Sequence, residues 1–306
     1  MQARTRRSFA ASLIVAAVLV VGFGMATAVL VGGTHTASAE KTQSKGTTTV
    51  ASTARLTTLL HPNSASELKG KPKKADSANW AGYAFVPKTA GNITEVFSEW
   101  YVPTAVCDEV SGATSEVAWI GIDGDGSSTV QQIGTADYCS GPGATPSYYL
   151  WYEFYPATPI TELAPTTPGA FVSAYVLYNP AEEYGGVNGV WTSEIFDVDN
   201  SQAFTVVATD YSLGYSPADA SAECISEAPS SVSSILPLTD YGQVTFYACD
   251  VTNGAVTTGI GGFHGSVGTT HEITQVEGGV TAQTPGALST YFGKDSTFTI
   301  TWDNYT

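Results

Sequence analysis

Residues 148–155 read Tyr-Tyr-Leu-Trp-Tyr-Glu-Phe-Tyr, a short run dominated by aromatic side chains. Aromatic residues favour β-strands, and successive side chains of a strand point to opposite faces. Trp151, Glu153 and Tyr155 therefore share one face of the expected strand. An acid between two large aromatic rings on one face is unusual for a protein core.

Nine further segments show the same two-residue periodicity, with turn signals between them. They are Glu95–Val102, Glu116–Ile122, Ala170–Leu177, Gly189–Phe196, Phe204–Thr209, Ala222–Glu227, Gln243–Val251, His271–Val276 and Thr297–Trp302. No sustained helical stripe follows residue 77, and 31 Gly and 15 Pro favour turns. Many short strands without helical crossovers predict an all-β fold, an antiparallel β-sandwich of two packed sheets.

The charge of the 306-residue chain is divided unevenly along its length. The whole chain has 12 Lys and Arg against 28 Asp and Glu, but from Ser77 onward 25 acidic residues face only Lys88 and Lys294. Such a surface repels phosphate backbones and excludes nucleic acid as a partner. It suits a medium acidic enough to protonate many carboxyl groups, since model Asp and Glu titrate near pH ~4.

The N-terminal residues 1–39 have the pattern of a secretory signal peptide. Arginines at 4, 6 and 7 precede a mostly apolar run from about Phe9 to Val31, and Ala37-Ser38-Ala39 provides small residues at a cleavage site. This predicts a secreted, extracellular protein. Because the apolar run is long enough to cross a bilayer, an uncleaved membrane anchor is the alternative.

Residues 40–76 form a second segment, with seven basic and three acidic residues. This net positive charge is opposite to that of the chain that follows. The segment is either a solvated linker or a propeptide that binds the acidic body near neutral pH and is released when carboxylates are protonated. We predict a propeptide, followed by a single domain at 77–306.

Four cysteines follow residue 77, at 107, 139, 224 and 249. An even number in an exported chain predicts two disulfides, and three pairings are possible. We favour Cys107–Cys139 and Cys224–Cys249, the latter because both residues lie in strand-like segments that could be neighbours. Reduced cysteines in the core are the alternative.

Several kinds of site lack their sequence signatures. The body has only His264 and His271, and no Gly-x-Ser-x-Gly surrounds a serine. Zinc-protease, phosphate-loop and dinucleotide motifs are absent, so we expect no metal and no cofactor. The remaining chemistry is that of carboxylates and amides beside aromatic rings, which favours a binding cleft over a core.

Four motifs together resemble the glutamic peptidase (eqolisin) family of secreted, acid-active endopeptidases. They are Asn79-Trp80-x-Gly82; Trp119-x-Gly-Ile-Asp-Gly-Asp125 with Gln132-x-Gly134; Trp151-Tyr-Glu153; and Ala222-Glu-x-Ile-x-Glu227. The resemblance covers roughly residues 77–306. It implies a lectin-like (concanavalin A-like) sandwich and a catalytic Gln/Glu pair in a groove, in an enzyme that acts on proteins or peptides and is expected to be a monomer.

The resemblance assigns roles to individual residues. The catalytic glutamine falls on Gln132, with Gln131 as the alternative because the preceding loop is one residue shorter than the family pattern. The catalytic glutamate falls on Glu227. Substrate-binding or supporting positions are Trp119, Asp123, Asp137, Trp151, Glu153, Tyr155 and Glu223. Two positions depart from the pattern: Cys224 replaces an aromatic residue and Tyr149 replaces an acid. The interval from Gln132 to Asp137 is also one residue longer than the family pattern.

These roles suit acid conditions, in which histidine is already protonated and is a poor base. Glu227 is expected to activate a water as general base, and Gln132 to donate its amide to the oxyanion. Two alternatives remain at this point. A lectin-like sandwich could be a carbohydrate-binding module, or Glu153 and Glu227 could be the carboxylate pair of a glycosidase.

Overall fold

The structure is a computed structural model that describes residues 74–108, 112–230, 234–263, 267–291 and 294–305. These residues belong to one compact unit. The predicted signal peptide, and the predicted propeptide up to residue 73, lie outside the described residues. Within the described ranges, no helix is long and apolar enough to span a membrane.

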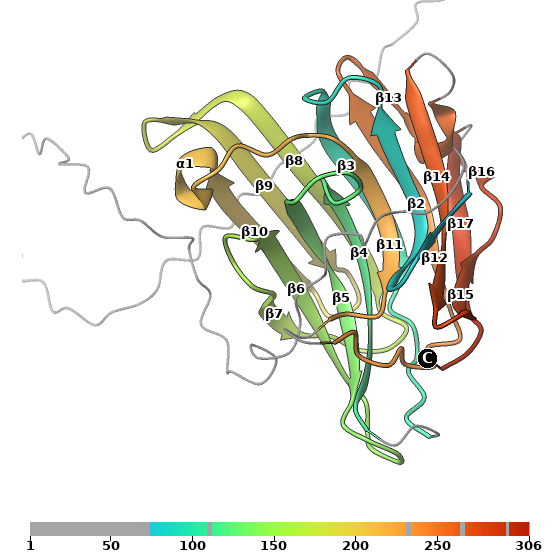
Figure 1. Ribbon diagram of the computed structural model, residues 1–306. Coiled ribbons are helices and arrows are strands. Elements are labelled where there is room, and N and C mark those ends of the chain that lie inside the picture. Colours follow the sequence, from blue (N-terminus) through green and yellow to red (C-terminus); the bar gives the residue numbers. More distant parts are fainter. Residues whose placement is uncertain (1–73, 109–111, 231–233, 264–266, 292–293, 306) are drawn as a thin grey trace, which may run out of the picture. The chain divides into compact units, whose positions relative to one another are not determined.

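Strands make up nearly all of the regular structure, and their pairing divides them into two layers (Figure 1). The first layer is β7 (Thr161–Pro165), β6 (Ser147–Tyr155), β5 (Val130–Cys139), β4 (Thr114–Ile122), β11 (Ala222–Glu227), β2 (Trp80–Pro87) and β14 (Gly268–Glu277), in that spatial order. All of these pairs are antiparallel. At its edge, β1 (Lys74–Ser77) pairs with β14 in parallel.

The second layer is β10 (Gln202–Thr209), β9 (Val187–Asp197), β8 (Phe171–Tyr184), β3 (Ile93–Tyr101), β12 (Gln243–Asn253) and β17 (Lys294–Trp302). The smaller elements are β13 (Val256–Gly259), β15 (Val280–Pro285), β16 (Ser289–Tyr291), the helix α1 (Asp210–Leu213) and the 3-10 turn η1 (Ile260–Gly262). Because β15 pairs with both β14 and β17, the two layers are joined along one edge. The predicted all-β antiparallel sandwich is confirmed.

All ten segments predicted to be strands are strands. The longest strands that periodicity missed are β2 and β5, whose burial patterns show almost no alternation. Both lie inside the first layer and are covered on both faces. A strand with two buried faces has no polar side in its sequence, which removes the signal on which the prediction depended.

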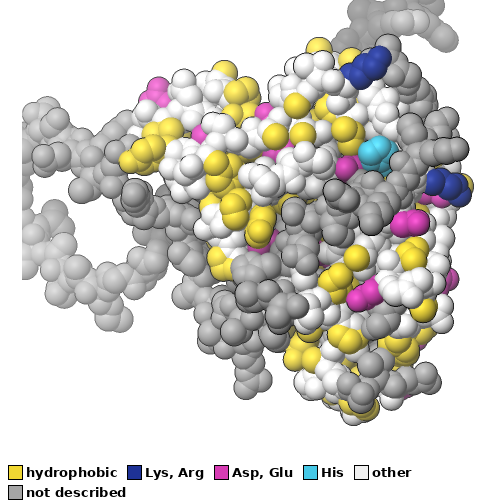
Figure 2. All heavy atoms as spheres, viewed as in Figure 1, with side chains coloured by type: hydrophobic (Ala, Val, Ile, Leu, Met, Phe, Trp, Pro, Cys, Tyr) yellow, Lys and Arg dark blue, Asp and Glu magenta, His cyan; other side chains and the backbone are white. Residues whose placement is uncertain are grey.

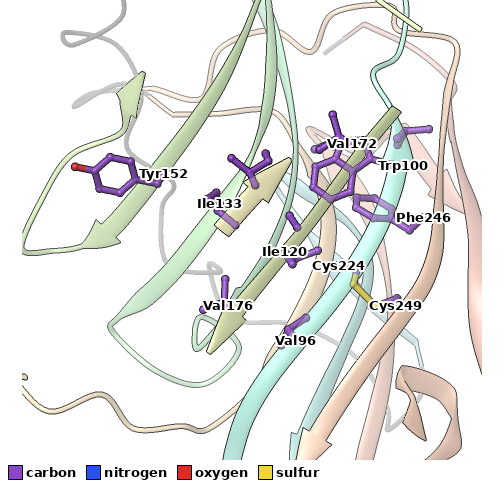
Figure 3. Close-up of a cluster of buried hydrophobic side chains, with 14 of the residues drawn as sticks. Val96, Trp100, Ile120, Ile133, Tyr152, Val172, Val176, Cys224, Phe246 and Cys249 are labelled. Carbon is purple, nitrogen blue, oxygen red and sulfur yellow. A yellow bond between two sulfur atoms is a disulfide. The ribbon is translucent and has the colours of Figure 1, made fainter. Parts of the chain in front are cut away.

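The main hydrophobic core lies between the layers, where side chains such as Ile120, Ile133 and Trp100 are fully buried (Figure 3). Both predicted disulfides are present. Cys224–Cys249 lies within this core and connects β11 of the first layer to β12 of the second (Figure 3). It therefore ties together the two layers at their centre.

A second apolar cluster lies on the other face of the first layer. It contains Trp80, Trp119, Trp151 and Ile225, none of which points into the core between the layers. We call this the outer face of the first layer. Three buried tryptophans on one sheet face, away from the main core, mark the region where a functional site is expected.

Candidate active site

Strand β4 fixes which side chains reach the outer face. Ala118, Ile120 and Ile122 lie in the interlayer core. Because side chains alternate along a strand, Trp119 and Gly121 point to the outer face. Side chains of directly paired residues point to the same face of a sheet, so the pairing of β4 with β5 and β11 also gives the orientation of the side chains on those two strands.

On β5, Gly121 lies opposite Gln132, whereas Ile122 lies opposite Gln131. Gln132 therefore points to the outer face and Gln131 to the inner one, where its Nε2 donates to the Tyr215 hydroxyl at 3.0 Å. This orientation favours Gln132 over Gln131 as the glutamine of the site.

Gln132 is fully buried and contacts an acid from the neighbouring strand. Its Nε2 donates to Glu153 Oε2 at 2.7 Å, because Gln132 and Glu153 are opposite each other in the β5–β6 pair. Its Oε1 is buried and has no hydrogen-bond partner among the described residues. Burial raises the pKa of Glu153, and the nearby Glu227 raises it further, while the Gln132 hydrogen bond opposes both.

Glu227 lies at the end of β11, also on the outer face. Its Oε1 accepts a hydrogen bond from Asn79 Nδ2 at 2.8 Å, and its Oε2 accepts one from Trp119 Nε1 at 2.9 Å. The side chain is fully buried, which raises the pKa of Glu227 well above its ordinary value, and the two donors act in the opposite direction. Donors on both oxygens favour the ionised form of a carboxyl group.

Trp119 links the two halves of the site. Glu227 lies opposite Val117 of β4, four residues along the strand from the row that holds Gln132. The Trp119 indole covers this interval: its Nε1 bonds Glu227, while its six-membered ring packs above Gly121. A Cβ atom at Gly121 would lie 2.9 Å from Trp119 Cζ3 and 3.2 Å from Gln132 Cβ. The absence of a side chain at this position is what allows the ring to approach Gln132.

Glu223 belongs to the same row as Gln132, since both lie opposite Gly121. Its Oε1 accepts a hydrogen bond from the backbone N–H of Asp125 at 3.3 Å. Asp125 in turn contacts His271 Nδ1 at 2.5 Å. His271 is therefore paired with an acid at the edge of this face.

Asp123 holds backbone segments in place. Its carboxylate accepts hydrogen bonds from the Thr129 hydroxyl and from the backbone N–H groups of Ala218 and Ala220, at 2.8–3.0 Å. Ala218 and Ala220 belong to the loop that leads into β11. Asp123 is fully buried, and its hydrogen bonds to the loop before β11 help to position that strand.

The predicted aromatic residues Trp151 and Tyr155 lie on the outer face of β6, in register with Glu153. Both contribute to the second apolar cluster. Their position beside the Gln132–Glu153 pair matches the predicted walls of a substrate site.

Asp137 is a correction to the predicted site. Its side chain lies on the inner face of β5, where its Oδ1 accepts a hydrogen bond from the backbone N–H of Glu116 at 3.0 Å. The physical reason is the extra residue noted in the sequence: Gly134 is on the outer face, and a position three residues later must point inward. Burial raises the pKa of Asp137 to about 7.

Sequence reasoning missed the role of Asn79. Asn79 belongs to the Asn79-Trp80-x-Gly82 motif, but no local pattern pairs it with an acid 148 positions away. Only its place in a motif rich in aromatic and amide residues could have suggested it.

Comparisons with known proteins identify the family of this chain. The sequence profile of the Peptidase A4 family matches residues 78–285. Aspergillopepsin-2 of Aspergillus niger is 26% identical over 211 residues, which are 63% of this chain and 71% of that protein.

Two solved structures share the fold. Scytalido-glutamic peptidase, solved with a peptide-based transition-state analogue, superposes with a TM-score of 0.58 at 18% identity, covering 74% of this chain and 98% of that one. The aspergilloglutamic peptidase of Aspergillus niger has a TM-score of 0.50 at 20% identity, covering 62% and 99%. These relatives are peptidases, so the carbohydrate alternatives gain no support from them.

Proposed function

Because this chain belongs to the peptidase A4 family, and is therefore a glutamic endopeptidase, we propose that Gln132 and Glu227 are its catalytic pair. The observation that carries the proposal is that both side chains occupy the outer face of one sheet, where the Trp119 indole that bonds Glu227 lies over Gly121, the residue opposite Gln132. The two side chains also differ in their hydrogen bonds: the Glu227 carboxylate accepts two, whereas the Gln132 amide donates one to Glu153.

Glu227 is the general base. Its ionised carboxylate takes a proton from a water molecule as that water attacks the peptide carbonyl carbon, and then passes the proton to the leaving amine. Asn79 and Trp119 donate to the carboxylate from opposite sides, which fixes its position.

Gln132 stabilises the oxyanion of the tetrahedral intermediate through its amide N–H groups. An amide does not titrate, so this donor acts at any pH. One Nε2 hydrogen is held by Glu153, which orients the amide, and the buried Oε1 is positioned to accept from the attacking water.

Glu153 supports this pair as a neutral acid. Burial and the nearby Glu227 both raise the pKa of Glu153, so the proton of the two carboxyls resides on Glu153 when Glu227 is ionised. Trp119, Trp151 and Tyr155 supply apolar walls for the substrate, while Asp123 and Glu223 fix the edge of the site near Asp125.

The effects of burial and of hydrogen bonding on the pKa of Glu227 determine how activity should depend on pH. Burial raises the pKa of Glu227 and its two donors lower it, so the base loses its proton above the range of an ordinary glutamate. The value of kcat/KM is therefore expected to rise with pH across the acid range. Because the proposed pair is a glutamine and a glutamate, rather than two aspartates or a set of metal ligands, activity is expected to be insensitive to pepstatin and to chelators.

We further propose that the protein is secreted and that the basic segment at 40–76 inhibits the acidic body. Figure 2 shows acidic side chains spread over one side of the molecule, with few basic ones. A peptide of residues 40–76 should inhibit more strongly near neutral pH than in strong acid, because protonated carboxyls no longer attract lysines. Equal inhibition at both pH values would contradict the electrostatic explanation.

The deciding experiment is acid activation of the purified full-length chain, followed by an assay on casein or haemoglobin. Cleavage in acid that persists with pepstatin and with EDTA supports the proposal. Cleavage that pepstatin abolishes, or that survives replacement of Glu227 by Gln, refutes the assignment of the pair.

A further inference from the structure

Asn79 lies in the two-residue connection between β1 and β2 and is fully buried. It contacts the end of β11 in two ways. Its side-chain Nδ2 donates to Glu227 Oε1 at 2.8 Å, and its backbone carbonyl accepts from the N–H of Ala228 at 2.9 Å. Main-chain and side-chain contacts thus hold the same acid in place.

Ser77, the last residue of β1, determines which way the Asn79 amide points. Its hydroxyl donates to Asn79 Oδ1 at 3.3 Å and accepts from the backbone N–H groups of Asn79 and Trp80 at 3.3 and 3.1 Å. Since Oδ1 is the acceptor toward Ser77, the donor Nδ2 must face Glu227. The amide therefore presents only N–H to the carboxylate.

We propose that Asn79 is a positioning residue for Glu227: it holds the carboxylate in the orientation in which it takes a proton from water, and it favours the ionised form. This inference rests on the proposed function of Glu227. An N–H donor stabilises a carboxylate more than a neutral carboxyl group.

The groups that surround Glu227 make this donor important. Glu153 from β6 and Glu116 from β4 are both close enough for the charge of Glu227 to raise the pKa of each. Complete burial favours the neutral form of Glu227. The hydrogen bonds that Asn79 and Trp119 donate oppose this effect of burial.

The test is the pH dependence of kcat/KM for Asn79→Ala. Loss of the donor should move the acid limb of the profile upward by about one pH unit, which is about a tenfold loss at a pH below the limb. Asn79→Asp keeps the shape but adds a third acid, and should move the limb at least as far. Ser77→Ala, which frees the amide to rotate and also removes the acceptor of two backbone N–H groups, should produce a smaller shift in the same direction.

Asn200→Ala is the matched control. Asn200 Nδ2 also donates to a carboxylate at 2.8 Å, that of Asp197, far from the site in the sequence and in the other layer. This variant should lower the melting temperature without moving the limb.

An unchanged limb in Asn79→Ala, with only a lower melting temperature or a uniform loss of activity, would overturn the inference. If Asn79→Ala does not fold, an unchanged limb in folded Asn79→Asp does the same. The outcome is separable from the proposed function: an inactive Glu227→Gln with an unshifted Asn79 profile refutes the positioning role alone, whereas an active Glu227→Gln refutes the base itself.

Discussion

Gln132 and Glu153 lie opposite each other across the β5–β6 pair, and the amide of one donates to the carboxylate of the other at 2.7 Å. The contact places an uncharged donor beside an acid whose pKa burial raises well above its usual value. Gln131, the residue before Gln132 in the sequence, points to the opposite face and does not share this contact.

Replacing Gln132 by Ala should lower kcat about 10²–10³-fold, because one oxyanion donor is lost. The matched control is Gln131→Ala, which removes the hydrogen bond to Tyr215 on the inner face and should affect stability more than rate. Steady-state kinetics on a chromogenic peptide would measure both. If Gln131→Ala is the more damaging change to kcat, the assignment of Gln132 is wrong.

Replacing Glu227 by Gln should lower kcat by about 10²–10⁴-fold and leave the fold intact, because the base is lost while shape is retained. Circular dichroism and thermal unfolding would check the fold. Glu116→Gln is a suitable control, since Glu116 is an equally buried glutamate that points to the inner face of β4. Comparable losses in the two variants would mean that burial, not catalysis, explains the effect.

Gly121→Ala should reduce activity, because the new methyl group meets Trp119 Cζ3 at 2.9 Å and the backbone oxygen of Gln131 at 3.0 Å. A displacement near 1 Å at a catalytic group costs roughly 100-fold. Gly286→Ala, where the only close atom is the Thr299 backbone oxygen at 3.2 Å, should have a much smaller effect. Equal kcat/KM values for the two variants would contradict the role given to the Trp119–Gly121 contact.

Thermal stability should fall as pH rises from about 4 to about 7. Burial raises the pKa of Asp137 and of Asp219 from 3.8 to about 7, so the folded chain holds protons that the unfolded chain has lost within this interval. The free energy of unfolding is therefore highest below pH 4 and decreases progressively between pH 4 and pH 7.

Asp137→Asn should flatten this dependence, with a melting temperature at pH 7 that rises by about 2–4 °C for each kcal/mol regained. Differential scanning calorimetry across the pH range would measure it. A wild-type protein that is more stable at pH 7 than at pH 4 would show that these two carboxyls do not control the response.

The mature enzyme should retain β1. The sequence placed the domain boundary between residues 76 and 77, but Lys74–Ser77 pairs with β14, buries Ala75 and orients Asn79 through Ser77. Cleavage after Asp76 would remove most of this strand. N-terminal sequencing of the fully active enzyme should give a first residue at or before Ala75, and a later first residue contradicts the prediction.

Much of the fold followed from local patterns. The strand predicted at Ala222–Glu227 has the same bounds in the structure. Its acids at 223 and 227 are interspersed with apolar residues, which is the pattern of a half-buried strand. Strand β5 was missed although it carries Gln132, since burial of both of its faces erases the alternation.

The sequence alone determined the strand periodicity, the acidic body and the motifs that identify the family, because each is encoded in residues close together in the chain. The disulfide pairing could be favoured among three possibilities but not fixed. Only the tertiary structure decided which face each side chain occupies: one inserted residue turned Asp137 inward, and strand register brought Asn79 to Glu227. Contacts of this kind depend on the pairing of strands far apart in sequence, and no local pattern records that pairing.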